Sequence, residues 1–205
     1  MKAMPNESSD ERLRLFVAIA IPEQVRNEII AVQKELKTLA LGDVRWTNEE
    51  QFHLTLKFLG NVPASSVEAV KESLAQACAV TAPFHLRAEG IGFFPNEWQP
   101  RVVWVGFEDD KNELTVLQMR VERLLAPFVE KPGAEKFLAH ATLGRFQKYR
   151  RHKTEQLMPR ALTHQHRVFG GWQVENAGLF RSELSLDGAR HSVVAVFPFG
   201  AKLEA

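Results

Sequence analysis

The sequence predicts an α+β protein of two lobes, in which mostly antiparallel sheets face each other across a central cleft with helices on the outside. Strand-like and helix-like segments alternate along the chain, and no linker divides its 205 residues. A strand with the pattern His-x-Thr-x occurs once in each half, each time after a strand and a helix, which indicates a pseudo-duplicated fold. We therefore expect a flexible tail at residues 1–11 and a single two-lobed domain at residues 12–205.

Apolar spacing and the positions of Pro and Gly predict the elements of the first half. β-forming residues run from Leu13 to Ile21 and stop at Pro22, which indicates a buried strand followed by the start of a helix. Apolar residues then recur every three or four positions, as in an amphipathic helix. The predicted elements are strands at 13–21, 44–46 and 53–60, and helices at 23–40 and 65–80, with a turn at 61–63.

The second half begins with a predicted hairpin and ends in a strand-rich segment. Residues 95–100 form the hairpin tip, acidic residues 108–110 favour the start of a helix, and Asp187-Gly188 is a second hairpin signal. The predicted elements are strands at 84–94, 101–107, 138–146, 167–172, 174–181, 182–186 and 192–199, and helices at 108–127 and 154–162.

The composition is that of an ordinary globular protein, with 45% hydrophobic and 25% charged residues. A net charge of +1 provides no global field for nucleic acid, so any nucleic-acid partner would need a local basic patch. The single cysteine, Cys78, excludes a disulfide framework within the chain. Because the chain starts with polar residues and contains no long apolar stretch, we expect a cytoplasmic protein without membrane contact.

The His-x-Thr-x pattern begins at His53 and again at His140. Residues two apart in a strand point to the same face, so His53 shares a face with Thr55, and His140 shares one with Thr142. A third match at His152 lacks apolar neighbours and lies in a basic run, so we set it aside. Two strand-borne copies, one in each half, favour a functional pair of histidines.

The pair has two other interpretations. A half-buried His and Thr bonded to their neighbours would be purely structural, and for one motif alone that interpretation would be preferred. A zinc site would need three or four protein ligands, and the sequence offers no Cys cluster, no His-Glu-x-x-His and no carboxylate on these strand faces. We therefore expect no metal and no cofactor.

These segments resemble the two-histidine phosphoesterases, and the fuller pattern is similar to the RNA 2′,3′-cyclic phosphodiesterases, also called the 2′-5′ RNA ligase family. The resemblance extends from Arg12 to Phe199, with Ala141 standing where a larger apolar residue is common. The segments that carry it are RLFVAI at 14–19, VRW at 44–46, HLTLKFLG at 53–60, RVVWVG at 101–106 and HATLGRF at 140–146.

The resemblance implies metal-independent hydrolysis of RNA 2′,3′-cyclic phosphate ends to 2′-phosphomonoesters, with 2′-5′ RNA ligation as the reverse reaction. It makes His53 the general acid for the leaving 3′-oxygen and His140 the general base for water. In-line displacement at phosphorus needs an acid and a base on opposite sides, and histidine can serve as either near neutral pH. The residues themselves do not decide which histidine has which role.

The expected partner is RNA with a 2′,3′-cyclic phosphate end, tRNA fragments among the candidates, and we expect a monomer. Two alternatives stay open. One is a phosphodiesterase acting on small cyclic nucleotides or ADP-ribose cyclic phosphate, and the other is a non-catalytic RNA-binding module.

Three residues are candidates for holding the phosphate. Thr55 and Thr142 can donate hydroxyl hydrogen bonds to its non-bridging oxygens, and the guanidinium fork of Arg145 suits a phosphate clamp. Simple alternation puts Arg145 on the wrong face, so the clamp requires a bulge at Gly144 or an approach from the strand end. A surface ion pair is the alternative for Arg145.

Further candidates would bind the rest of the RNA. Lys148, Arg150 and Arg151 belong to a basic run that either contacts phosphates in a salt-dependent way or is simply a solvated loop. Trp98 and Phe16 could stack on the terminal base, although packing in the core is the favoured interpretation for Phe16.

Overall fold

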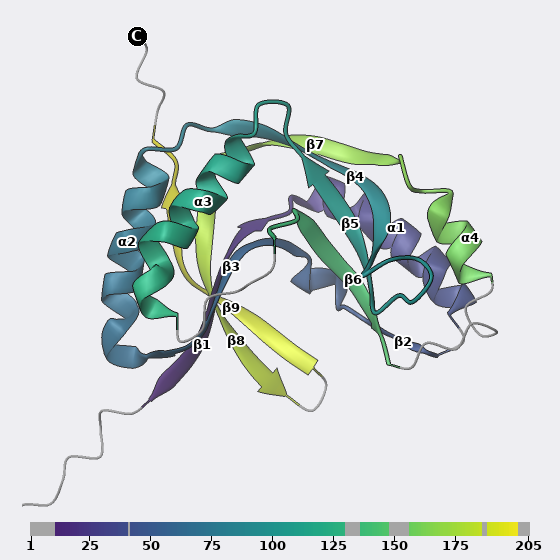
Figure 1. The fold of residues 1–205 in the computed structure, drawn as a ribbon, viewed down its shortest axis with the longest axis horizontal. Helices are drawn as coiled ribbons and strands as arrows, with labels where there is room; N and C mark the ends of the chain where they lie inside the picture. The colour runs from purple at the N-terminus through teal and green to yellow at the C-terminus, as the bar shows by residue number, and fades with distance from the viewer. Residues whose placement is uncertain (1–10, 41, 130–135, 148–155, 186–187, 201–205) are drawn as a thin grey trace, which may run out of the picture.

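The computed structural model describes residues 11–40, 42–129, 136–147, 156–185 and 188–200. Within these ranges, nine strands form two sheets and four α-helices cover them (Figure 1). Every strand pair in both sheets is antiparallel. The predicted α+β class, with antiparallel sheets and helices on the outside, is confirmed.

Sheet A has the strand order β3-β1-β8-β9, and sheet B has the order β2-β6-β5-β4-β7. The strands of sheet A are β1 (Arg12–Ala20), β3 (His53–Pro63), β8 (Asn176–Ser185) and β9 (Gly188–Pro198). Those of sheet B are β2 (Val44–Trp46), β4 (Phe84–Phe94), β5 (Val102–Glu108), β6 (His140–Phe146) and β7 (Val168–Val174). The two His-bearing strands, β3 and β6, contact each other where the sheets meet.

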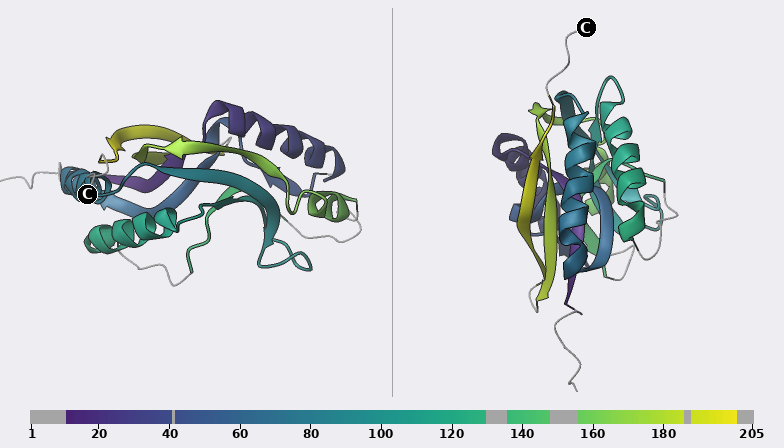
Figure 2. Two further views of the ribbon diagram at one scale, coloured as in Figure 1. Left: turned by 90° about the horizontal axis from the view of Figure 1, so that it is seen from above. Right: turned by 90° about the vertical axis from the view of Figure 1, so that its left-hand side faces the viewer.

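Two helices pack on each sheet, as Figures 1 and 2 show. α2 (Val67–Ala79) and α3 (Glu113–Leu125) lie side by side on sheet A, where they contact β9 and β3. α1 (Glu23–Leu39) and α4 (Leu157–Leu162) contact each other and the β7 and β4 strands of sheet B. Each apolar helix face is thereby buried against one face of a sheet. The opposite face of each sheet is left for the side chains of His53 and His140. No helix in the described ranges is long and apolar enough to cross a membrane.

The duplication is visible in two strand–helix–strand units. In the first, β1 and the His-bearing β3 flank α1 and pair with each other; in the second, β5 and the His-bearing β6 flank α3 and pair likewise. The helix of each unit packs on the other unit's sheet, since α1 contacts β7 and α3 contacts β3. The two units are therefore interlocked.

Three predicted boundaries were wrong. Residues 61–63 continue β3, because Asn61 pairs with Arg14 of β1, and they do not form a turn. Residues 108–110 do not begin a helix: Glu108 ends β5, and the Asp109 carboxylate accepts a hydrogen bond of 2.8 Å from the backbone N–H of Leu114 in the first turn of α3. The predicted strands 174–181 and 182–186 are one strand, β8, because it pairs along its length with β9.

A buried ion pair ties β3 to α3. The Lys57 side chain is 4% exposed, and its Nζ lies 2.5 Å from Oε1 of Glu122, whose side chain is 43% exposed. Replacing Glu122→Gln leaves a buried ammonium without its counter-charge, so we expect the free energy of unfolding, measured by urea denaturation, to fall by about 2–3 kcal/mol.

The matched control is Glu68→Gln, which removes an exposed ion pair of 2.7 Å with Lys71. Exposed pairs contribute little, so this change should cost less than about 1 kcal/mol. Equal losses for the two variants would contradict a special role for the buried pair.

Candidate active site

Each of the two histidines makes the same kind of local hydrogen bond, from its Nδ1 atom to the carbonyl oxygen two residues before it. Nδ1 of His53 lies 2.7 Å from the carbonyl oxygen of Gln51, and Nδ1 of His140 lies 2.7 Å from the carbonyl oxygen of Leu138. A carbonyl oxygen can only accept, so each Nδ1 carries the proton and donates it. The Nε2 atom of each ring is consequently the one that can exchange a proton with a ligand.

A β-bulge follows the threonine in β3. Thr55 pairs with Ala18 of β1, but the next neighbour of Ala18, Val17, pairs with Lys57. Leu56 is therefore the extra residue, and the strand buries both Leu56 and Lys57.

The same bulge occurs in β6. Thr142 pairs with Trp104 of β5, whereas Val103 pairs with Gly144, so Leu143 is the extra residue. Leu143 and Gly144 are both buried, as Leu56 and Lys57 are in β3. The two motifs are thus equivalent in register, burial and side-chain hydrogen bonding.

The bulge places Arg145 on the face of sheet B that carries His140 and Thr142. Directly paired residues point to the same face, and Arg145 pairs with Val102, two residues from the partner of Thr142. Arg145 therefore shares a face with His140 and Thr142, although simple alternation assigned it to the other face. Its side chain is exposed, and its charge contributes to lowering the pKa of His140.

Contacts around Leu143 and Gly144 hold the bulge. The Leu143 carbonyl accepts hydrogen bonds of 2.9 Å from the Thr47 backbone N–H and from Nε2 of Gln33, a fully buried residue of α1. The Gln33 amide also donates to the Thr47 carbonyl at 2.9 Å. A Cβ on Gly144 would lie 2.7 Å from Cγ1 of Val44, so glycine permits β2 to approach this closely.

In β3, the position equivalent to Arg145 is Phe58. It pairs with Phe16, two residues from the partner of Thr55, and so shares the face of His53 and Thr55. The Phe58 side chain is 64% exposed. The histidine-bearing face therefore carries an exposed aromatic ring in sheet A and an exposed guanidinium in sheet B.

Burial makes both imidazoles weaker bases than a free histidine. It is the main reason why the pKa of His53 is lowered from 6.5 to about 4, with smaller contributions from the charges of His191 and His140. Burial also lowers the pKa of His140, and the charge of Arg145 adds to this effect. The hydrogen bonds to the Gln51 and Leu138 carbonyls oppose these shifts. The strands that carry the two rings, β3 and β6, contact each other.

The ring of Phe16 packs against the imidazole of His53. Its ring centroid lies 4.8 Å from that of His53 and 5.3 Å from that of Phe180, on which it stacks. At 2% exposure, Phe16 offers almost no surface to a nucleobase, which agrees with packing in the core, the interpretation favoured for it over base stacking. His140 similarly rests edge-on against Phe94, at a centroid distance of 4.9 Å.

Sequence reasoning missed His191, which lies beside His53. Their ring centroids are 5.1 Å apart at an interplanar angle of 76°, although β9 and β3 are opposite edges of sheet A. The sheet is curled enough to bring these edges together, and the Gln51 side chain donates a hydrogen bond to the Ala189 carbonyl of β9. The neighbours of His191 in the sequence carry no motif, so no local signal could have placed it here.

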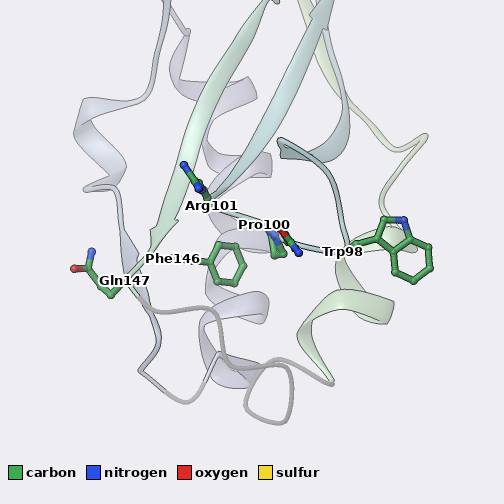
Figure 3. Close-up of a pocket in the computed structure, with 6 residues that line it drawn as sticks. Trp98, Pro100, Arg101, Phe146 and Gln147 are labelled. Carbon is green, nitrogen blue, oxygen red and sulfur yellow. The ribbon is translucent and has the colours of Figure 1, made fainter.

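Trp98 lies in the loop between β4 and β5. It is 74% exposed and lines a pocket of about 600 Å³ with Arg101, Phe146 and Gln147, seen in Figure 3. Neither His53 nor His140 lines this pocket. The stacking role expected for Trp98 therefore stays a prediction. Lys148, Arg150 and Arg151 lie outside the described residues.

No cluster of three or more His, Cys, Asp or Glu side chains that could hold a metal ion occurs in the part of the chain described. Cys78 is buried, and burial raises the pKa of its thiol to about 12. A thiol with so high a pKa is a packed side chain rather than a nucleophile.

Comparison with known proteins gives a consistent result. The sequence profile described as LigT like phosphoesterase matches residues 19–104. A protein of Archaeoglobus fulgidus called RNA 2′,3′-cyclic phosphodiesterase is 30% identical over 185 residues, or 90% of this chain and 99% of its own. One of the same name from Aquifex aeolicus is 29% identical, over 92% of this chain and 98% of its own.

Solved structures show the same fold. A Thermus thermophilus protein superposes with a TM-score of 0.77 and 27% identity, covering 93% of this chain and 100% of its own. Escherichia coli LigT in complex with 3′-AMP gives a TM-score of 0.74 at 22% identity, covering 92% of this chain and 99% of its own. At that identity the second likeness concerns the fold alone.

Proposed function

The chain belongs to the LigT-like phosphoesterase family, and from this premise we propose that it hydrolyses RNA 2′,3′-cyclic phosphate ends to 2′-phosphomonoesters. One observation carries the proposal: two equivalent strands present two imidazoles whose Nδ1 atoms are bound to carbonyls and whose Nε2 atoms can exchange protons. The names of the relatives from Archaeoglobus fulgidus and Aquifex aeolicus support the substrate class.

In this proposal His140 removes a proton from the attacking water and His53 protonates the leaving 3′-oxygen. The two oxygens lie in line on opposite sides of phosphorus, which is why a histidine is needed from each sheet. Each proton transfer contributes a rate factor of about 10²–10⁴. Ligation on the same site would use a 5′-hydroxyl in place of water as the nucleophile on the cyclic phosphate, so that the 3′-oxygen leaves with a proton and a 2′-5′ linkage forms.

Three side chains would bind the phosphate during this reaction. Thr55 and Thr142 lie one step from each histidine on the same face, and their hydroxyls can donate to the non-bridging oxygens. Arg145 approaches from the same face through the bulge and supplies a charge-assisted contact. Water is the nucleophile, so no side chain needs to form a covalent intermediate.

The low pKa of His53 sets a condition on its acid role. With a pKa of about 4, His53 is neutral in the free protein near pH 7. A phosphodiester bound between the rings carries a negative charge, which favours the protonated form of either imidazole. Substrate binding thus supplies the electrostatic partner that makes His53 an acid, and the two rings titrate as a coupled pair.

This coupling predicts an acidic optimum for kcat/KM, which reports the free enzyme. The reaction needs one ring protonated and one neutral, and both pKa values are lowered from 6.5. Above pH 6.5 both rings lose their protons, so kcat/KM should fall about tenfold per pH unit. The kcat profile should lie at higher pH, because the bound anion raises both pKa values. A kcat/KM maximum above about pH 7.5 would contradict this assignment.

The direct test is to incubate the protein, in the presence of EDTA, with an oligonucleotide that ends in a 2′,3′-cyclic phosphate. We expect a 2′-phosphomonoester, identified by its chromatographic separation from the 3′ isomer. Turnover of 2′,3′-cyclic nucleotides or ADP-ribose cyclic phosphate but not of the oligonucleotide would favour the small-molecule alternative. Binding of the oligonucleotide without turnover would favour a non-catalytic RNA-binding module.

The remaining RNA contacts belong to the same proposal. The exposed indole of Trp98 could stack on a base away from the cyclic end, and Lys148, Arg150 and Arg151 follow β6 in the sequence. We further propose cytoplasmic RNA, including tRNA fragments, as the substrate and a monomer as the active form. Support for the monomer is that both histidines come from one chain.

A further inference from the structure

Two arginines lie side by side on the face of sheet B that carries His140 and Thr142. Arg45 of the edge strand β2 pairs directly with Arg145 of β6, so both side chains point to the same face. Directly opposed residues of antiparallel strands have Cβ atoms about 5 Å apart. Both side chains are exposed.

This pairing is unfavourable in the free protein. Like charges opposite each other in a sheet repel, and no carboxylate pairs with either arginine among the residues described. Val102, the β5 partner of Arg145, is apolar and supplies no counter-charge. A bound anion would turn the repulsion into two attractive contacts.

The position of the pair indicates which anion. Arg145 shares its face with His140 and Thr142, where the cyclic phosphate is expected, and Arg45 lies one strand further out on the same face. In an RNA strand the next anion after the terminal phosphate is the phosphodiester on the 5′ side of the terminal nucleotide. A guanidinium beside the clamp is suited to such a group.

We infer that Arg45 binds the phosphodiester on the 5′ side of the terminal nucleotide, so that the site selects oligonucleotides over cyclic mononucleotides. The inference rests on the proposed function, because it takes the cyclic phosphate to lie between His53 and His140. Arg45 is a specificity residue in this arrangement and takes no part in proton transfer.

The test compares 2′,3′-cyclic AMP with a trinucleotide that ends in a 2′,3′-cyclic phosphate. For Arg45→Ala we expect KM for the trinucleotide to rise about tenfold, while kcat and both constants for cyclic AMP stay unchanged. The slope of log KM against log salt for the trinucleotide should change by about 0.7, the value for one phosphate contact to a single strand. The midpoint of thermal unfolding should not fall, because the substitution removes a repulsion.

Arg123→Ala is the matched control. Arg123 is exposed in the last turn of α3, a helix that covers the outer face of sheet A, so the same charge is removed far from the site. We expect this variant to leave KM for both substrates unchanged. A similar rise in KM for both variants would reduce the effect to net charge and overturn the inference.

Other outcomes separate the inference from the proposed function. Equal losses on the two substrates would assign Arg45 to the cyclic phosphate itself, and no effect on either would also overturn the subsite. If the unmodified protein hydrolyses neither substrate, the proposed function fails. The subsite is then judged by the binding of a fluorescein-labelled trinucleotide, which Arg45→Ala must weaken.

Discussion

The substitutions His53→Asn and His140→Asn should each lower the rate of cyclic phosphate hydrolysis by a factor of about 10²–10⁴. Asparagine can keep the hydrogen bond that Nδ1 donates to the Gln51 or Leu138 carbonyl, but it lacks a group at the position of Nε2. The loss would therefore report proton transfer and not a collapse of the strand. Single-turnover kinetics on a cyclic-phosphate oligonucleotide measure it.

Two controls accompany these variants. His164→Asn changes a buried histidine that lies 3.3 Å from Glu35, on the helix side of sheet B, and should leave the rate unchanged. EDTA should not affect the unmodified protein. Full activity of either the His53→Asn or the His140→Asn variant would exclude the two-histidine mechanism. Loss of activity with EDTA would indicate that the reaction needs a metal ion.

Replacing Arg145→Ala should lower kcat by a factor of about 10²–10³, because one charge-assisted donor to the developing charge is lost. Arg145→Lys keeps the charge but not the planar fork, so it should recover part of the loss. The thermal midpoint should change little for either variant, because the side chain is exposed.

Gln33→Leu extends this test to the bulge. Gln33 touches no substrate, but its amide donates to the Leu143 carbonyl at the bulge that orients Arg145. If the bulge positions Arg145, Gln33→Leu should lower kcat and add little to the effect of Arg145→Ala in the double variant. Fully additive losses of kcat would show that Gln33 acts independently of Arg145.

Local patterns were sufficient for most of the fold. Apolar spacing located the helices, and the His-x-Thr-x alternation put His53 with Thr55 and His140 with Thr142 on shared faces. The errors came where pairing with a distant strand overrode local signals. Asn61 looks like a turn residue, yet it continues β3 because Arg14 lies opposite it.

The site could be predicted in part for the same reason. The sequence showed that Arg145 needs either a bulge or an approach from the strand end. The observed bulge depends on β5 and on Gln33, which is 110 residues from Leu143 in the chain. Arg45 and His191 belong to the site face only because of strand pairing and sheet curling, which no short window of sequence records. Phe16 was expected in the core, and its burial agrees.

The bulges at Leu56 and Leu143 bear on the choice of product. A cyclic phosphate can open at either of two P–O bonds, and two equivalent histidines could exchange roles if the ring bound in reverse. Phe58 and Arg145 occupy corresponding positions but differ in polarity, so the two orientations of the nucleotide are energetically distinct. In the proposed mechanism the duplicated half-sites would supply reactive groups in matched positions, while Phe58 and Arg145 would favour one orientation of the nucleotide and hence a single product isomer.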